Sequence, residues 1–202
     1  KNKKNKDLKK ILQKYNFQHF EGSEKNVLER FYFCAKKFNS KNIIRITADC
    51  PLSDPQIIDK FTQIFKNKNV DYLSNGNPPT FPDGFDVEIF TFNALEKSYF
   101  NAKSLYEKEH VTPYIKKNNF FSKYNVINKI DLSNIRLTVD YVEDLVVVKK
   151  IISQIKNKAD YSLENVIKII NKDKEIMKLN SIYKRNTGSR NSENQKLWER
   201  AK

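Results

Sequence analysis

Apolar and polar positions follow two periods along the chain, one typical of helices and one typical of strands. Residues 43–47 are apolar at both odd and even positions apart from Arg45, which predicts a strand buried on both faces. Pro51 ends this strand because proline donates no backbone hydrogen bond. Asp54 and Pro55 then predict a helix start, with an N-cap residue followed by the proline favoured in a first turn.

Segments with the two periods alternate along the rest of the chain. Apolar residues at helical spacing predict helices near 7–15, 27–35, 55–65, 91–102, 109–115, 143–152 and 163–170. Apolar runs and short-period alternation predict strands near 17–20, 70–73, 85–89, 120–127 and 135–139. This succession predicts an α/β fold with three layers, α/β/α, around a mixed and mostly parallel sheet.

The strand near 85–89 shows the strictest alternation. Asp86 and Glu88 are expected on one of its faces. The other face is expected to carry the apolar residues Phe85, Val87 and Ile89. The preceding loop, 74–84, holds two of the four glycines and three of the six prolines. Loops of this length without regular structure are typically functional.

The composition indicates a globular domain. The 202 residues are 39% hydrophobic and 12% aromatic, enough for a sizeable core. We predict a domain over residues 7–180 and a polar linker or tail over 181–202. No apolar run has the length of a membrane span and no signal-peptide pattern is visible, so we expect no membrane partner. Cys34 and Cys50 form no CxxC pair, which favours a reducing cytoplasm.

The net charge of +14 raises the question of nucleic-acid binding. The lysines, however, are dispersed over the whole chain, as on solvated helix faces. A basic stripe with interleaved aromatic residues is missing, so the charge pattern argues against a nucleic-acid partner.

Two acidic residues, Asp49 and Asp140, each follow a predicted strand and precede a helix. If the two strands are parallel and close, both carboxylates emerge at one edge of the sheet. Mg²⁺ needs only one or two carboxylates beside waters and the phosphates of a nucleotide. Alternatively, Asp49 caps a turn and Asp140 caps its helix, as acidic residues commonly do. Spacing alone leaves both interpretations open.

Several segments in series carry a resemblance to a known family. They are FEGSE at 20–24, VLER at 27–30, RITADCPL at 45–52, DYLSN at 71–75, FPDGFDVE at 81–88, EHVTPY at 109–114, RLTVD at 136–140 and EDL at 143–145. Together they resemble the cytidylyltransferase-like family of spore-coat polysaccharide biosynthesis proteins, which are relatives of the CMP-sialic acid and CMP-Kdo synthetases. The resemblance implies a nucleotide-diphospho-sugar transferase-like fold.

The resemblance also implies an activity: transfer of CMP from CTP to a hydroxyl of an acidic sugar or related acceptor, with release of pyrophosphate. By the family's pattern Asp49 and Asp140 hold Mg²⁺ as the cofactor. Arg136 and His110 are the candidate catalytic residues. Candidate substrate-binding residues are Arg45, Asp83, Gly84, Asp86, Glu88 and Glu109.

Some of these residues also have simpler interpretations. Arg45 and Arg136 suit bidentate pairing with an anionic group of a substrate. Arg45, inside a strand, is alternatively the partner of a neighbouring acid. His110 alternatively bonds buried backbone groups, and Asp83-Gly84 is a turn signal in any fold.

The sequence departs from the family at its start, where the first βα unit with its basic, Gly-containing phosphate loop is lacking. Ala48 stands where the family commonly has Gly, and Tyr141-Val142 where it has Thr-Pro. Either this is a fragment of a longer protein, or the chain cannot bind nucleotide in the family's usual way, and the activity of this piece is in question. Residues 197–202 resemble the opening of a following domain, which in some relatives is a PLP-dependent aminotransferase. Relatives are often homodimers.

Two other functions are compatible with the sequence. A glycosyltransferase that uses a nucleotide-sugar donor has a similar fold and consumes the nucleotide-sugar instead of CTP. A non-catalytic basic binding module is the other alternative, and steeply salt-dependent retention on DNA would indicate it.

Overall fold

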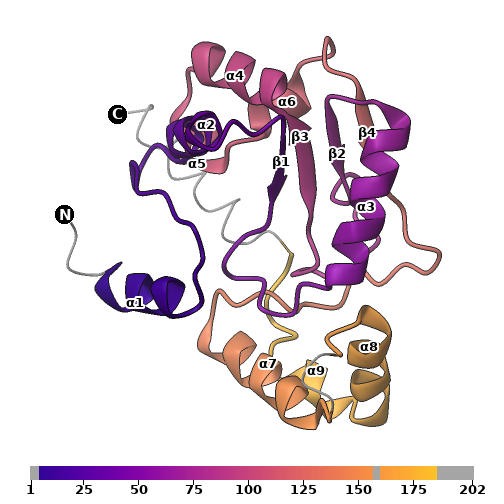
Figure 1. Cartoon of the computed structure of the whole chain (residues 1–202). Coiled ribbons are helices and arrows are strands. Elements are labelled where there is room, and N and C mark those ends of the chain that lie inside the picture. The colour runs from indigo at the N-terminus through magenta and orange to yellow at the C-terminus, as the bar shows by residue number, and fades with distance from the viewer. Residues whose placement is uncertain (1–4, 157–159, 186–202) are drawn as a thin grey trace, which may run out of the picture.

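The computed structural model describes residues 5–156 and 160–185. In this part of the chain the sheet has the strand order β1-β3-β2-β4 (Figure 1). The strands are β1 (Asn42–Arg45), β2 (Tyr72–Ser74), β3 (Glu88–Thr91) and β4 (Lys123–Asn125). β3 runs antiparallel to both β1 and β2, whereas β2 and β4 are parallel. Three of these strands therefore point the same way and β3 is reversed, which confirms the mixed sheet.

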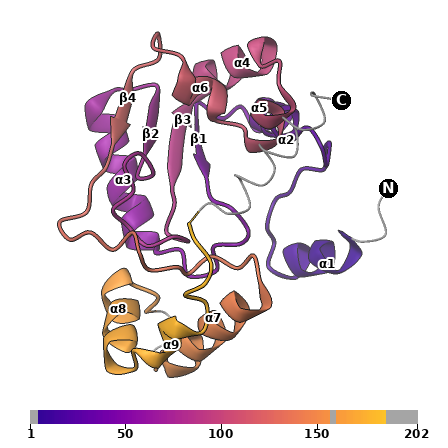
Figure 2. The ribbon, with the colours of Figure 1, turned by 180° about the vertical axis from the view of Figure 1, so that it is seen from behind.

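Helices cover both faces of the sheet and its lower end in the view of Figure 1. They are α2 (Val27–Lys37), α3 (Pro55–Lys68), α4 (Phe92–Asn101), α5 (Leu105–His110), α6 (Pro113–Lys117), α7 (Val142–Gln154), α8 (Leu163–Lys172) and α9 (Glu175–Lys178). The first helix, α1 (Lys6–Lys14), buries none of its residues and lies apart from the sheet (Figure 1). Seen from behind in Figure 2, α3 again flanks β2 and β4, and α7 to α9 lie beyond the strand ends.

Two hydrophobic cores lie on opposite faces of the sheet. Leu73 and Ile89 belong to the core shared with α3, α7 and α8. Their neighbours Tyr72 and Phe90 belong to the second core, shared with α2, α4 and α6. Because successive strand residues point to opposite faces, β2 and β3 each contribute to both cores. This arrangement confirms the three-layer α/β/α fold.

The start of α3 forms as its sequence predicts. The Asp54 carboxylate accepts a hydrogen bond from the backbone of Gln56 at 2.8 Å, and Pro55 opens the helix. The same carboxylate accepts a bond from the backbone of Leu163 at 2.9 Å. Asp54 therefore caps α3 and also ties it to the start of α8.

The predicted burial of the first strand on both faces is wrong. Ile44 is 43% exposed and Ile46, just beyond the strand end, is 40% exposed. The physical reason is the position of β1 at the edge of the described sheet, where β3 is its one neighbour. An edge strand has fewer neighbours to cover its side chains.

Two other predicted strands are not regular strands. Residues 17–20 are irregular, and residues 135–139 form only an isolated bridge between Arg136 and Asp83. The amides of Leu137 and Val139 bond two different segments, the first to the carbonyl of Asp83 and the second to that of Asp49. Because the bonds divide between two partners, no single ladder continues along 135–139.

The helices of the described residues include none long and apolar enough to cross a membrane. The predicted segment 197–202, which resembles the opening of a further domain, lies outside the described residues.

Candidate functional site

The loops that carry Asp49 and Asp140 are joined beyond the end of β1 by two hydrogen bonds to the carbonyl of Asp49. The amide of Val139 donates to the carbonyl of Asp49 at 2.8 Å, and the Thr138 hydroxyl donates to the same oxygen at 3.3 Å. Asp49 is half-buried and Asp140 is exposed. The structure therefore brings the two predicted metal residues to one edge of the fold. We call this edge, formed by Asp49 and residues 138–140, the rim.

Loop 75–87 closes one side of this rim and is held from within by Asn75. The buried Asn75 amide donates to the carbonyl of Phe85 at 2.8 Å, and its oxygen accepts from the amide of Val87 at 3.0 Å. Gly84 has φ +99°, and an added Cβ would lie 2.6 Å from the backbone carbon of Leu137. Only glycine fits this contact, because a side chain would clash with the neighbouring backbone in a strained conformation.

Arg136 lies at the centre of a buried ion cluster. Its Nε donates to Asp144 Oδ1 at 3.0 Å, and its Nη2 donates to Asp144 Oδ2 at 2.8 Å and to Asp140 Oδ2 at 2.7 Å. Its Nη1 donates to Asp83 Oδ2 at 3.1 Å and to the carbonyl of Lys184 at 3.3 Å. A guanidinium has five N–H donors, so all of them are used by protein acceptors. We call Asp83, Arg136, Asp140 and Asp144 the Arg136 cluster.

This saturation changes the role expected of Arg136. The sequence predicted that Arg136 holds an anionic group of a substrate. None of its N–H donors is left for such a group, because protein acceptors use all five. Burial lowers the pKa of Arg136, whereas its hydrogen bonds to Asp144 and Asp140 raise it above the ordinary value. The residue is thus a permanent cation that fixes three carboxylates in place.

The carboxylates of this region have different proton affinities. Burial, with the nearby charge of Asp86, raises the pKa of Asp83 to about 6 against the lowering effect of Arg185 and Arg136. Asp144, by contrast, has a lowered pKa because the hydrogen bonds from Arg136 and Asn180 outweigh its burial. Asp144 is therefore ionised near neutral pH, while Asp83 titrates close to it.

Three residues of this region were not predicted as site residues: Asn180, Arg185 and Asp144, which the sequence placed only in the EDL segment. The Asn180 amide donates to the carbonyl of Arg136 at 3.1 Å and to Asp144 Oδ1 at 2.8 Å. Arg185 forms an ion pair with Asp86. No apolar periodicity marks residues 180–185, and the one local signal was the aromatic Tyr183 in a polar stretch.

The candidate residue Glu88 begins β3 and is buried. Its carboxylate accepts bonds from Arg45 Nη1 and the Tyr72 hydroxyl at 2.5 Å each. The Thr112 hydroxyl and Lys116 Nζ each lie 2.7 Å away. Glu88 thus holds β1, β2 and α6 together, and Arg45 is the partner of a neighbouring acid. Asp86 precedes β3 and pairs elsewhere, so the two acids do not share one strand face.

Replacing Glu88 with Gln is expected to lower the free energy of unfolding by about 2–4 kcal/mol at pH 7, because two cations lose their partner. Burial raises the pKa of Glu88, but Lys116 and Arg45 lower it to about 2 from its ordinary 4.5. A lowered pKa stabilises the fold in full above pH 4.5, and the effect is lost as the pH falls toward 2.

Urea unfolding of wild type and Glu88→Gln at pH 7 and pH 3 measures this difference. The stability gap between them is expected to shrink at pH 3. The exposed Glu164, paired with Lys168 on the surface, provides the matched control Glu164→Gln. An equal gap at both pH values would contradict the role of the Glu88 charge.

The segment with Glu109 and His110 is joined to Glu88 through a strained turn. Val111 is fully buried with φ +71° and ψ −55°, and the amide of Thr112 bonds the carbonyl of His110 at 2.8 Å. This γ-turn conformation is rare and costly for a β-branched residue. The His110 ring packs on Tyr106 with 4.6 Å between centroids. The catalytic role of His110 stays a prediction.

Cys50 supports the neighbouring Asp49. Its thiol lies 3.5 Å from Asp49 Oδ1 and 3.1 Å from the Thr47 hydroxyl. Burial raises the pKa of Cys50 to about 12 despite the hydrogen bond with Thr47. The thiol is therefore neutral and a poor nucleophile.

Comparison with known proteins identifies the family. The sequence profile described as cytidylyltransferase matches residues 2–150. The chain belongs to the cytidylyltransferase family. A solved cytidylyltransferase from Leptospira borgpetersenii superposes with a TM-score of 0.84 at 33% identity, over 88% of this chain and 75% of that one. This likeness confirms the nucleotidyltransferase-like fold.

Two curated relatives match most of this chain. An uncharacterized protein of Methanocaldococcus jannaschii is 37% identical over 80% of this chain and 66% of its own length. The spore coat polysaccharide biosynthesis protein SpsF of Bacillus subtilis is 29% identical over 79% of this chain and 67% of its own length. The chain thus spans about two thirds of the relatives it matches.

The rim of this cytidylyltransferase-family chain fits Mg²⁺ in its chemistry. Among the described residues no group of three or more His, Cys, Asp or Glu side chains is placed to hold a metal ion. Mg²⁺ does not need such a group, because it commonly takes one or two carboxylates beside waters and substrate phosphates. Asp49 and Asp140 supply two carboxylates at the rim.

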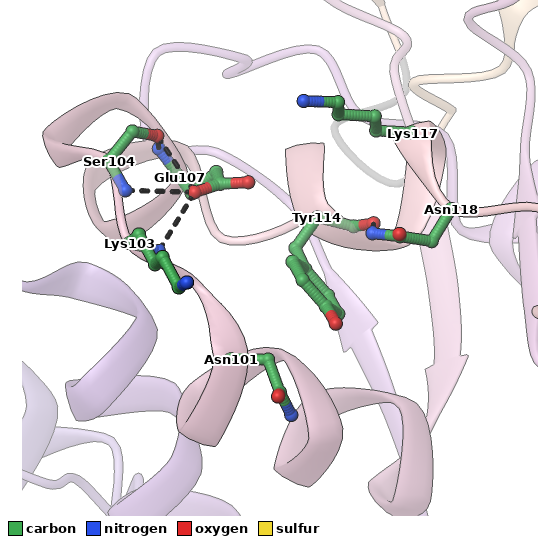
Figure 3. Close-up of a pocket in the computed structure, with 7 residues that line it drawn as sticks. All are labelled: Asn101, Lys103, Ser104, Glu107, Tyr114, Lys117 and Asn118. Carbon is green, nitrogen blue, oxygen red and sulfur yellow. Dashed lines mark hydrogen bonds between the residues drawn. The ribbon is translucent and has the colours of Figure 1, made fainter.

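A separate hollow of about 560 Å³ lies between α4, α5 and α6 (Figure 3). Its lining is polar and consists of Asn101, Lys103, Ser104, Glu107, Tyr114, Lys117 and Asn118. Glu107 is committed there to the capping box of α5 with Ser104. The predicted site residues are absent from this lining, so the rim is the better candidate site.

Proposed function

We propose that this chain transfers CMP from CTP to a hydroxyl group of an acidic sugar or related acceptor in surface polysaccharide biosynthesis, with Mg²⁺ as cofactor. The observation that carries the proposal is the bond between Val139 and Asp49, which places the two candidate metal loops side by side. Membership of the cytidylyltransferase family supports the reaction class. The name of the Bacillus subtilis relative, a spore coat polysaccharide biosynthesis protein, supports the pathway class.

In this proposal the protein's own residues position the reactants. Asp49 and Asp140 hold Mg²⁺, which when bound neutralises charge on the phosphoryl oxygens. Arg136 fixes Asp140 by taking one of its two oxygens at 2.7 Å. Asp86, whose side chain is 36% exposed, accepts a hydrogen bond from the acceptor hydroxyl. The acceptor oxygen attacks the α-phosphorus of CTP while its hydroxyl proton passes to Asp86. The bond from the α-phosphorus to the oxygen that bridges it to the β-phosphate breaks, and pyrophosphate leaves.

The proposal is tested by measuring pyrophosphate release from CTP with sialic acid or Kdo as acceptor. Release is expected to require CTP, acceptor and Mg²⁺ together, and to stop on chelation with EDTA. In a parallel reaction, a nucleotide-sugar replaces CTP as the donor. Consumption of the nucleotide-sugar without turnover of CTP would contradict the proposal and indicate a glycosyltransferase. The homodimer, the fused aminotransferase domain and the cytoplasmic location stay predictions.

A further inference from the structure

Residues 180–185, here called the C-terminal strap, run from α9 back to the candidate site (Figures 1 and 2). Asn180 anchors the start of the strap on Arg136 and Asp144, as described above. The Tyr183 ring stacks on Tyr141 with 3.9 Å between centroids and 7° between planes. The Tyr183 hydroxyl donates to Glu143 at 3.0 Å. The strap is therefore fixed to the Arg136 cluster and to α7.

The strap delivers the guanidinium of Arg185 to loop 75–87. Arg185 Nη1 donates to the carbonyl of Phe81 at 3.0 Å, and Nη2 pairs with Asp86 Oδ1. Its charge also lowers the pKa of Asp83 against the effect of burial. Arg185 thus stands among the residues predicted to line the acceptor side.

The two arginines of the site differ in what they can still bind. Arg136 uses all five N–H donors and faces three carboxylates, so a further anion would be repelled there. Among the described residues, Arg185 has two hydrogen bonds and one carboxylate partner. These two bonds use two of the five N–H donors of Arg185 and do not use the other three. The anion-holding role predicted for Arg136 therefore suits Arg185.

We propose that Arg185 binds an oxyanion of a substrate, either a phosphate group of CTP or the carboxylate of an acidic acceptor. The inference rests on the proposed function, because it assigns a residue to that site. The rim and loop 75–87 beside it carry Asp49, Asp83, Asp86 and Asp140, so an anionic substrate needs a cation there to offset their repulsion. The planar fork of arginine binds phosphate and carboxylate oxygens in pairs.

The direct test is a titration of the ¹⁵N-labelled chain, followed through the arginine Nε–H signals by NMR. The signal lost in Arg185→Lys identifies Arg185. Pyrophosphate and sialic acid, added separately, are the two probes. One of them is expected to shift the Arg185 signal while the signal of Arg136 stays in place, and the probe that does so identifies the source of the oxyanion. No shift with either probe would overturn the proposal.

Variants give a second measurement with a matched control. Arg185→Ala is expected to weaken binding of the recognised probe about tenfold or more, as for loss of charge-assisted hydrogen bonds. Arg185→Lys keeps the charge and is expected to recover part of the affinity. Lys178→Ala removes an exposed charge of α9 and is expected to change nothing. Equal affinity in wild type and Arg185→Ala would overturn the proposal.

The two proposals fail in different ways. A shifted Arg185 signal in a chain that consumes a nucleotide-sugar instead of CTP would support the oxyanion site and contradict the cytidylyl transfer. CTP turnover with unchanged KM values in Arg185→Ala, together with an unshifted Arg185 signal in wild type, would support the cytidylyl transfer and contradict the oxyanion site. A purely structural role of Arg185 predicts a lower melting temperature with unchanged probe affinity, and that result also counts against the oxyanion site.

Discussion

Asp49→Asn is expected to lower Mg²⁺-dependent release of pyrophosphate by on the order of a thousandfold, or about 4 kcal/mol in activation free energy. The amide keeps the size of the side chain but supplies no negative charge to hold the cation. Asp140→Asn is expected to have a similar effect, because both loops meet through the bond of Val139 to Asp49.

The control for both variants is Asp59→Asn, which changes an exposed carboxylate on α3. It is expected to leave pyrophosphate release unchanged. Wild-type release in either Asp49→Asn or Asp140→Asn would remove that residue from the metal site. Comparison of the magnesium concentration needed for half-maximal release, in any variant with residual activity, separates loss of metal affinity from loss of rate.

Arg136→Ala is expected to lower the free energy of unfolding by about 3–5 kcal/mol, the largest stability effect that we predict. The side chains of Asp83 and Asp144 are 8% and 0% exposed, and both lose their charge partner in the variant. Uncompensated buried carboxylates take up protons more readily. The deficit of the variant is therefore expected to be larger at pH 7 than at pH 4.5.

Urea unfolding at the two pH values measures this prediction. Arg30→Ala is the matched control, since Arg30 donates to one carbonyl, that of Ser23, at 2.7 Å. Its loss is expected to be about 1 kcal/mol and independent of pH in this range. A small, pH-independent loss in Arg136→Ala would show that the buried carboxylates do not depend on this cation.

Local sequence rules predicted what depends on neighbours in the chain. The Asp54 cap with Pro55 formed as expected, and Thr91 caps α4 through the amide of Ala94. The regular strand expected at 135–139 did not form, because its hydrogen bonds divide between Asp49 and Asp83. Such a division depends on tertiary contacts that no periodicity reports.

The candidate site was predictable in its location but not in its internal pairing. The sequence predicted that Asp49 and Asp140 lie at one edge, and their loops are joined by the bond of Val139 to Asp49. Their role as metal ligands stays a prediction. The partners of Arg136 come from loop 75–87, from α7 and from the C-terminal strap, so its saturation could not be deduced from spacing. Glu88 likewise alternated with apolar residues as an outward-facing acid would, yet Arg45, Tyr72 and Thr112 enclose it.

The reversed strand β3 has a consequence for how the chain reaches its fold. β1 meets its one described neighbour through residues such as Arg45 and Glu88, which are 43 positions apart. During synthesis β1 therefore stays unpaired with β3 until β3 has emerged from the ribosome. Pairings of this separation slow folding, because the intervening loop must close first. In this interval Ile43 and Ile44 form an exposed strand edge, a candidate binding site for chaperones.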